Sequence, residues 1–285
     1  MSQERSKQIQ WYPGHMFKSM REIREKLKLM DMVMILLDAR LPRSSMNPDI
    51  VKTIKQKPAV ILLNKMDLAD DRETDRFIND FKKQGILALK IDAQNKRNIH
   101  QIEALAKLAL KDQLDKQKEK GLKDRPIRTM ILGIPNVGKS TLINALANKK
   151  ATRTANRPGV TRAQQWIKLG DTFELLDTPG VLWPKFEDEN IGMHLAITGA
   201  IKDHILPTDD IVCYALDFLK VHYPDRLKSR YDLLKDMSCI EMLDHIGRLR
   251  GALLKGADID YDRVYQIILT DIRNGQLGGL TFDRL

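Results

Sequence analysis

A glycine-rich segment at positions 133–140 has the residue types and the spacing that bind nucleotide phosphates. It reads Gly-Ile-Pro-Asn-Val-Gly-Lys-Ser, which fits the pattern GxxxxGKS/T. In such a loop the backbone N–H groups surround the phosphates, Lys139 reaches the outer two, and Ser140 coordinates Mg²⁺. The residues predicted to contact the phosphates are Asn136, Val137, Gly138, Lys139, Ser140 and Thr141.

Two further tetrapeptides each follow an apolar run. Asp-Thr-Pro-Gly at 177–180 supplies a carboxylate that typically holds Mg²⁺, and the N–H group of Gly180 can face a γ-phosphate. Asn-Lys-Met-Asp at 64–67 supplies a carboxylate, Asp67, that can accept hydrogen bonds from N1 and N2 of guanine. Adenine does not present these donors in that arrangement. The sequence therefore favours GTP over ATP, with Asn64, Lys65 and Asp67 near the base.

A third polar loop, Asp-Ala-Gln at 92–94, also ends an apolar run. We expect a backbone N–H group here to reach the guanine oxygen, so Ala93 is counted among the GTP-binding residues. Asp92 stands where serine is usual, which argues against a base contact by that side chain. Together, the phosphate, magnesium and guanine patterns predict an enzyme that hydrolyses GTP to GDP and phosphate, with Lys139 in a catalytic role.

The elements that carry these loops alternate between strand and helix. Apolar runs predict strands at 33–37, 59–63, 87–91, 127–132, 165–169 and 173–176. Helical spacing predicts helices around 20–30 and at 72–84, 99–120 and 140–147. Such alternation is typical of an α/β domain with a mainly parallel sheet that helices cover on both faces.

From residue 191 onward the apolar spacing is helical throughout, at 191–201, 211–221, 240–249 and 264–272. Asp209 and Ser238 are predicted helix N-caps, and Gly275 is a predicted helix stop. The chain is therefore divided into a GTPase domain with an N-terminal arm at 1–184 and an all-helical domain at 185–285.

The order of the motifs differs from that of Ras-like P-loop GTPases, in which the phosphate loop comes first. Here the guanine motifs precede the phosphate loop, and Arg-Pro-Gly-Val-Thr at 157–161 and then Asp-Thr-Pro-Gly follow it. A compact domain with adjacent termini tolerates such rewiring without moving its site. We therefore expect a circularly permuted Ras-like P-loop GTPase domain.

The positive charge lies in the first two thirds of the chain. The 285 residues carry a net charge of +10, but the segment 191–285 holds 12 basic and 14 acidic residues. The segment 149–168 has six basic residues and no acidic one, and the segment 1–30 has seven basic and three acidic residues. Both are expected to face phosphates, which makes a nucleic acid a plausible partner.

The cysteines and the apolar runs indicate the cellular compartment in which the protein is expected. Cys213 and Cys239 lie 26 positions apart without a CxxC pattern, so we expect neither a zinc site nor a disulfide, and a reducing environment. The polar start of the chain argues against a secretory signal, and no apolar run approaches the roughly 20 residues that span a bilayer. The expectation is a cytoplasmic protein without a membrane segment.

The chain resembles a known family on several of these segments. They are Trp-Tyr-Pro-Gly-His-Met at 11–16, the permuted motif order, Pro-Gly-Val-Thr, and Asp-Thr-Pro-Gly followed by Val-Leu-Trp-Pro at 181–184. In these it is similar to the circularly permuted YlqF/YawG-type GTPases, the ribosome biogenesis GTPase A family. The resemblance covers nearly the whole chain. It implies a factor that assembles the bacterial large (50S) ribosomal subunit and binds 23S rRNA in a late precursor.

The resemblance also implies that the precursor particle stimulates GTP hydrolysis, that the factor then leaves, and that the helical domain is an RNA-binding module. Two basic segments of that domain, 226–231 and 247–251, either grip rRNA or are solvated helix faces. The alternative function is a signalling GTPase switch that acts on protein effectors. A monomer is expected in either case.

Val181 follows Asp-Thr-Pro-Gly where Ras-like enzymes place the glutamine that orients the attacking water. The family resemblance suggests that His15 acts instead; otherwise His15 packs or contacts RNA, and Gln164 and Gln165 are the remaining candidates. Thr161 is predicted to coordinate Mg²⁺ in the GTP state.

The predicted Mg²⁺ ligands are thus Ser140, Thr161 and Asp177, and the predicted catalytic residues are His15, Lys139 and Thr161. By resemblance to potassium-activated GTPases, Asn136 is a candidate K⁺ ligand. The histidines at 100, 194, 204, 222 and 245 have no partners at ligand spacing and are interpreted as structural.

Overall fold

The computed structural model describes residues 14–122, 125–147, 165–184, 186, 188–201, 207–233 and 236–285, with the side chains of Gly14, His15 and Gln165 excepted. Thr161 and Gln164 lie outside the described residues. For His15 only the backbone is described, as part of a helix.

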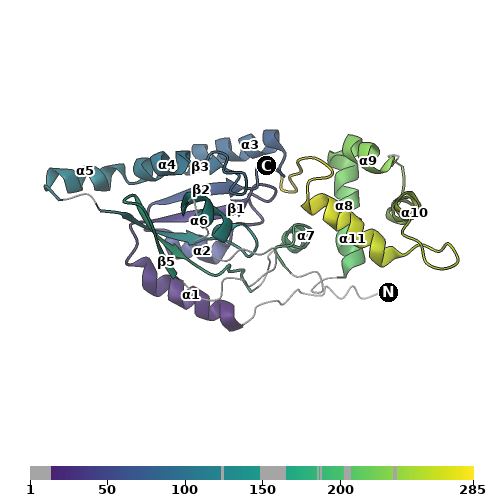
Figure 1. Cartoon of the computed structure of the whole chain (residues 1–285), viewed down its shortest axis with the longest axis horizontal. Helices are drawn as coiled ribbons and strands as arrows, with labels where there is room; N and C mark the ends of the chain where they lie inside the picture. Colours follow the sequence, from purple (N-terminus) through teal and green to yellow (C-terminus); the bar gives the residue numbers. More distant parts are fainter. Residues whose placement is uncertain are drawn as a thin grey trace.

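A six-stranded sheet forms one half of the molecule (Figure 1). Its strand order is β3-β2-β1-β4-β6-β5, and all neighbouring pairs are parallel except β5 with β6. The strands are β1 (Met32–Asp38), β2 (Ala59–Asn64), β3 (Leu87–Lys90), β4 (Ile127–Leu132), β5 (Gln165–Leu169) and β6 (Phe173–Asp177). These bounds confirm the predicted strands to within one residue at each end, and with them the α/β fold.

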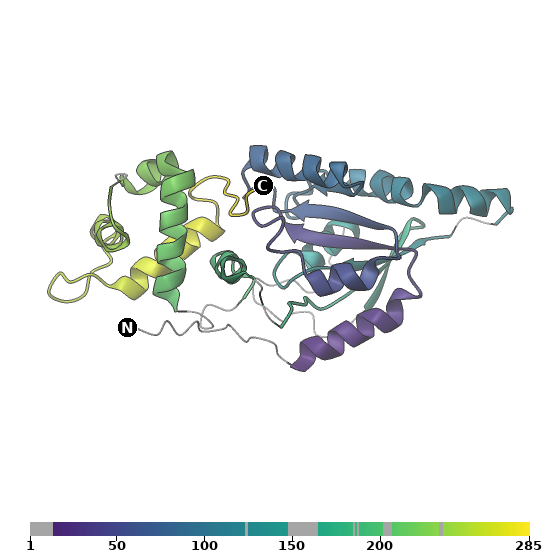
Figure 2. The same cartoon turned by 180° about the vertical axis from the view of Figure 1, so that it is seen from behind.

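Every residue of β1 is buried, which its uninterrupted apolar sequence anticipates, because helices cover both faces of the sheet. Helices α3 (Asp71–Lys83), α4 (Gln101–Ala109) and α5 (Lys111–Glu119) lie on one side. On the other side lie α1 (Gly14–Leu27) and α2 (Pro48–Ile54), as both views show (Figures 1 and 2).

Two features of these helices differ from the prediction. The single helix expected at 99–120 is divided into α4 and α5 at Leu110, whose backbone (φ −105°, ψ 8°) is not helical. Leu110 is buried in the core, whereas α5 has no buried residue. Packing of the Leu110 side chain in the core therefore coincides with the break between the two helices. In addition, α2 was not predicted; the side chain of Asn47 caps this helix, and Pro48 is its first residue.

The second half of the chain is helical. Its helices are α7 (Glu189–Ile197), α8 (Thr208–His222), α9 (Pro224–Tyr231), α10 (Cys239–Arg250) and α11 (Tyr261–Arg273), while α6 (Lys139–Ala147) belongs to the sheet half. Ser238 caps α10 in a capping box with Glu241, as predicted. The predicted cap at Asp209 is wrong, because α8 already begins at Thr208, directly after Pro207. The domain boundary at 184/185 remains a prediction.

Cys213 and Cys239 form a disulfide, which corrects the expectation of unpaired cysteines. Cys213 lies in α8, and Cys239 is the first residue of α10. Spacing along the chain gave no sign of the bond, because the pairing depends on the packing of α10 against α8. In the described part of the chain, no helix combines the length and the apolar character needed to cross a membrane.

The end of the chain returns from the helical half to the sheet. The backbone N–H of Leu280 donates to the carbonyl of Leu68 (2.9 Å), and that of Phe282 donates to the carbonyl of Arg40 (2.9 Å). Figure 1 shows the C-terminus between the two halves. The last residues are therefore part of the sheet half in space, although they follow the helical segment in sequence.

Candidate functional site

Lys139 lies folded back across its own loop. It is the first residue of α6, is nearly buried, and donates from Nζ to the carbonyl oxygens of Gly133 (3.0 Å) and Ile134 (2.8 Å). Burial lowers the pKa of this ammonium group, and the negative charge of Asp177 opposes that shift. Phosphate oxygens are stronger acceptors for an ammonium group than neutral carbonyls, so Lys139 is well placed to bind them.

Asp177 ends β6 and carries a carboxylate that is buried at the start of the Asp-Thr-Pro-Gly loop. The residue is fully buried, and neither Oδ1 nor Oδ2 has a partner among the described residues. Burial raises the pKa of the Asp177 carboxyl, against the lowering effects of Lys139 and the Thr178 N–H group. Unpaired buried carboxylate oxygens fit a hydrated Mg²⁺ ion, which prefers oxygen ligands. Asp177 and the predicted ligand Ser140 supply such a donor set.

Asn64 joins three of the four loops that the sequence predicts to bind GTP, namely 64–67, 92–94 and 133–140. Its side-chain Nδ2 donates to the carbonyl of Val137 in the phosphate loop (2.8 Å), and its Oδ1 accepts from the backbone N–H of Ala93 (3.0 Å). Asn64 itself ends β2, one position before Lys65. The structure thus brings together the phosphate loop and both guanine loops.

Two glycines allow these loops to approach each other. Gly138 has φ +100°, and a Cβ atom there would lie 2.3 Å from Nδ2 of Asn64. A Cβ atom on Gly180 would lie 2.6 Å from Cα of Pro135, and the next residue, Val181, donates its N–H to the carbonyl of Gly133 (3.2 Å). The Asp-Thr-Pro-Gly loop is therefore packed directly on the phosphate loop.

On the base side, the exposed Asp67 lies near a second carboxylate, that of Asp92. Partial burial of its carboxyl raises the pKa of Asp67, and the charge of Asp92 raises it further. Asp92 accepts hydrogen bonds from the backbone N–H groups of Gln94 (3.0 Å) and Asn95 (2.9 Å), so its side chain organises its own loop. The backbone N–H group of Ala93 donates to Oδ1 of Asn64. A hydrogen bond from Ala93 to guanine therefore stays a prediction.

Asn136 connects the phosphate loop to the helical half. Its backbone is left-handed (φ 57°), and its Nδ2 donates to the carbonyl of Gly199, just after α7 (2.8 Å). A K⁺ ion would need the side-chain oxygen, which is the other atom of this amide.

The residues predicted to activate water and to complete the Mg²⁺ site are not placed. The side chain of His15, the whole of Thr161 and Gln164, and the side chain of Gln165 lie outside the described part. The backbone of Gln165 pairs in register with Asp177. Val181 is fully buried, in line with an apolar residue that does not contact water.

Two charged residues beside the guanine loop, Asp38 and Arg40, were not predicted from the sequence. Asp38 ends β1, and its Oδ2 accepts from Nζ of Lys65 (3.0 Å) and from Nη2 of Arg40 (2.7 Å). The signal that could have found Asp38 is its position directly after an apolar strand, which it shares with Asn64 and Asp177.

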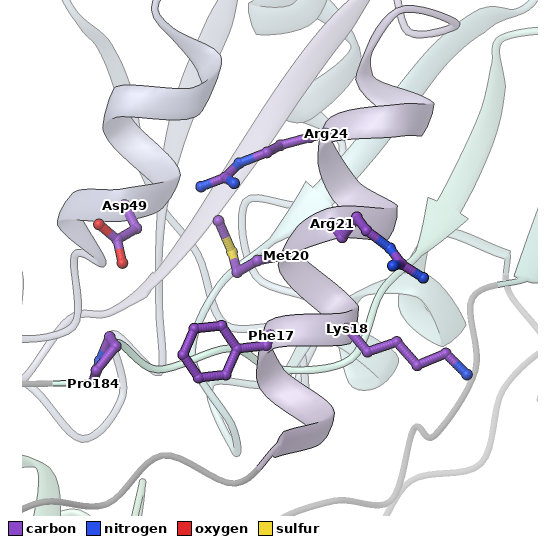
Figure 3. A pocket seen from close by; sticks show the side chains of 7 residues that line it. All are labelled: Phe17, Lys18, Met20, Arg21, Arg24, Asp49 and Pro184. Atoms are coloured by element: carbon purple, nitrogen blue, oxygen red, sulfur yellow. The ribbon is translucent and has the colours of Figure 1, made fainter.

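A surface pocket of about 590 Å³ lies between α1 and α2, near the segment that follows Asp-Thr-Pro-Gly. Figure 3 shows Phe17 pointing toward Pro184, and Arg24 reaching over Met20 toward Asp49. Lys18 and Arg21 also line the pocket, and the ends of their side chains extend toward the other side of α1 (Figure 3). The lining therefore combines apolar side chains with three cations and one carboxylate.

Comparison with known proteins identifies the family of the chain. Residues 128–243 match the model of a family described as "50S ribosome-binding GTPase". The chain is 52% identical over 276 residues to ribosome biogenesis GTPase A of Bacillus cereus, which covers 96% of this chain and 93% of the relative. It is 53% identical over 277 residues to the protein of the same name in Priestia megaterium, which covers 96% of each.

Solved structures show the same fold. GNP-bound YlqF from Thermotoga maritima matches with a TM-score of 0.67 at 26% identity, covering 94% of this chain and 98% of that one. A GDP-bound YlqF structure matches with the same TM-score at 27% identity, covering 93% and 99%. Identity above half over nearly the full length of both chains establishes the family. The chain therefore belongs to the ribosome biogenesis GTPase A family and is a GTPase that acts in ribosome biogenesis.

Proposed function

We propose that this GTPase binds 23S rRNA in a late precursor of the large ribosomal subunit, and that the particle stimulates GTP hydrolysis before the factor leaves. The observation that carries the GTP site is Asn64, which ties the phosphate loop to both guanine loops. The relatives' names supply the ribosomal context.

The proposed chemistry follows from the charged groups of the site. Lys139 exchanges its two loop carbonyls for phosphate oxygens, and Asp177 and Ser140 hold Mg²⁺ together with Thr161. Thr161 lies four positions before Gln165, whose backbone pairs with Asp177, which supports this assignment. When bound, Mg²⁺ neutralises charge on the β- and γ-phosphates.

Water activation is assigned to His15, because the residue after Asp-Thr-Pro-Gly is an apolar, buried valine. A histidine side chain that titrates near neutral pH can orient the attacking water molecule or accept a proton from it. K⁺ held by Asn136 is the proposed second ion of the site. His15→Ala should lower particle-stimulated turnover while GTP affinity stays near that of the wild type; unchanged stimulated turnover would contradict the assignment.

An RNA contact on α1 is supported by its exposed side chains. Phe17 is 62% exposed, an unusual state for a large aromatic side chain, and Lys18, Arg21 and Arg24 are exposed on the same helix. Aromatic rings stack on unpaired bases, and lysine and arginine bind the flanking phosphates. The acid-free segment 149–168 adds a second cationic stretch.

The α1 surface is tested by Phe17→Ala, with Leu29→Ala as the control because Leu29 is also exposed but does not line the pocket. Phe17→Ala should weaken binding to precursor particles about tenfold, the loss of one stacked base, while GTP affinity is unchanged. Equal particle binding by both variants would contradict the contact. We further propose that the protein is cytoplasmic and monomeric.

A further inference from the structure

A buried cluster of charged side chains lies directly behind the guanine loop. Asp38 accepts hydrogen bonds from Nε (2.9 Å) and Nη2 (2.7 Å) of Arg40, and from the Arg40 backbone N–H (3.1 Å). The same carboxylate accepts from Nζ of Lys65 (3.0 Å). One carboxylate therefore fixes two cations, and one of them belongs to the Asn-Lys-Met-Asp motif.

Burying these charged groups costs free energy, so the cluster differs from an ordinary ion pair on the surface. Arg40 is only 1% exposed, and Asp38 is buried as well. Burial alone would raise the pKa of Asp38, but the charges and hydrogen bonds of Arg40 and Lys65 hold it well below its usual range. Fixed charges in a buried site keep a definite geometry, because any displacement leaves an unpaired charge.

Lys65 depends on this support. Its backbone is left-handed (φ 62°), a conformation that costs energy for a residue with a side chain. The Lys65–Asp38 ion pair joins the ends of β2 and β1, which are paired in register at Asp38 and Asn64. The pair therefore holds the strained residue against the rigid sheet.

Arg40 in turn fixes the carboxylate that holds Lys65. Its guanidinium contacts both oxygens of Asp38, with Nε donating to Oδ1 (2.9 Å) and Nη2 donating to Oδ2 (2.7 Å). A planar guanidinium that binds a carboxylate through two hydrogen bonds sets the orientation of that carboxylate. Lys65 lies two positions before Asp67, so the cluster sets the position at which the Asn-Lys-Met-Asp loop begins.

We propose that Asp38 and Arg40 are positioning residues for guanine recognition: Asp38 anchors Lys65, and Arg40 fixes the carboxylate of Asp38 in the orientation that holds Lys65. Neither residue needs to touch the nucleotide. The inference rests on the proposed assignment of Asp67 to the guanine N1 and N2 donors.

The test compares the binding of GDP with that of inosine diphosphate, which lacks only the 2-amino group of guanine. Dissociation constants for both ligands are measured by calorimetry for the wild type, Asp38→Asn and Arg40→Lys. A positioning role predicts that each variant weakens GDP binding about tenfold and inosine diphosphate binding less, because the missing amino group has no hydrogen bond to lose. The preference for GDP should therefore shrink several-fold.

Asp31→Asn is the matched control. Asp31 directly precedes β1, at its opposite end, and forms an ion pair with Arg125 (2.7 Å). This variant should keep the wild-type preference for GDP. Circular dichroism melting shows whether each variant folds, and Arg40→Lys, which retains the positive charge, provides the readout if Asp38→Asn does not fold.

Two results would overturn the inference, and they are distinguishable. If folded Asp38→Asn or Arg40→Lys weakens both ligands by the same factor, the cluster supports the fold and not base recognition. If the wild type itself binds GDP and inosine diphosphate equally, Asp67 does not read the 2-amino group, and the guanine-site assignment fails together with the inference.

Discussion

Asp177 and Lys139 show how single residues prepare the site for a charged ligand. Both are buried, and burial makes each charged form less favourable than it is in water. A bound Mg²⁺–nucleotide complex supplies what both lack: a cation for the carboxylate and anionic oxygens for the ammonium group.

Asp177→Asn is predicted to weaken the apparent Mg²⁺ affinity in GTP hydrolysis by about 10- to 100-fold, the usual effect of losing a group that orients a metal ligand. The measurement is the GTP hydrolysis rate as a function of Mg²⁺ concentration. Asp171→Asn is the control, since Asp171 is an exposed acid in the turn between β5 and β6. Identical Mg²⁺ dependence in the two variants would contradict the role of Asp177.

The nucleotide-binding motifs could be predicted from the sequence because each is a short pattern placed directly after an apolar strand. Asn64 and Lys139 lie where that pattern predicts. The partnership of Asp38 and Arg40 with Lys65 was not readable, because it depends on the parallel pairing of two strands whose residues are far apart in sequence.

At the scale of elements, strands were predicted best, since their apolar runs reflect burial on both sides of a parallel sheet. The break between α4 and α5 and the pairing of Cys213 with Cys239 were missed. Both depend on what the helix packs against in the folded chain, which the apolar spacing of a single segment does not contain.

The disulfide is predicted to stabilise the helical half. Because it closes a loop of 26 positions, its reduction should lower the free energy of unfolding by about 3 kcal/mol in the chain-entropy model. Urea unfolding of the wild type with and without a thiol reductant measures this loss.

The double variant Cys213→Ser with Cys239→Ser should unfold at the lower urea concentration whether or not reductant is present. If the wild type purified without reductant has two free thiols and a midpoint that reductant does not change, the disulfide does not form in the protein.

At the scale of the whole molecule, the chain end holds the two halves together. Oδ2 of Asp283 accepts from the backbone N–H groups of Arg43 (2.6 Å) and Ser44 (2.8 Å). Its Oδ1 lies 3.1 Å from Nδ1 of His194, and Nε2 of this histidine contacts the hydroxyl of Tyr214 (2.9 Å). His194 on α7 thus bridges the helical half and the sheet half, which is consistent with a structural role.

Asp283→Asn is predicted to lower the free energy of unfolding by about 2 kcal/mol at about pH 7, because the backbone donors lose a charged acceptor. Burial alone would raise the pKa of Asp283, but the hydrogen bonds from His194 and Ser44 lower it. A lowered folded-state pKa gives stability that is present above the unfolded pKa and is lost as the pH falls through the folded value.

The difference between the wild type and Asp283→Asn should therefore shrink as the pH falls below about 4. Urea unfolding of both proteins at about pH 7 and about pH 3 measures it. A difference of equal size at both pH values would show that the ionised carboxylate does not carry the contact.

Hydrogen bonds between the two halves link the nucleotide site to the helical region. The Asn136–Gly199 hydrogen bond joins the phosphate loop to the end of α7, and the carbonyl of Arg40 accepts from the Phe282 N–H in the chain end. The sequence places the Asp-Thr-Pro-Gly loop, at 177–180, shortly before the predicted helical domain at 185–285. It did not predict that the chain end packs back beside the guanine loop, because that contact joins segments more than 200 residues apart.

The central claim is that a large-subunit particle controls GTP hydrolysis by this protein. The most direct test measures GTP turnover by the purified protein in K⁺ and in Na⁺, with and without isolated large ribosomal subunits at moderate salt. The proposal predicts slow basal turnover that the subunits raise many-fold, with a larger rate in K⁺. Turnover that is indifferent to the subunits would contradict it and would favour a signalling switch that acts on protein effectors.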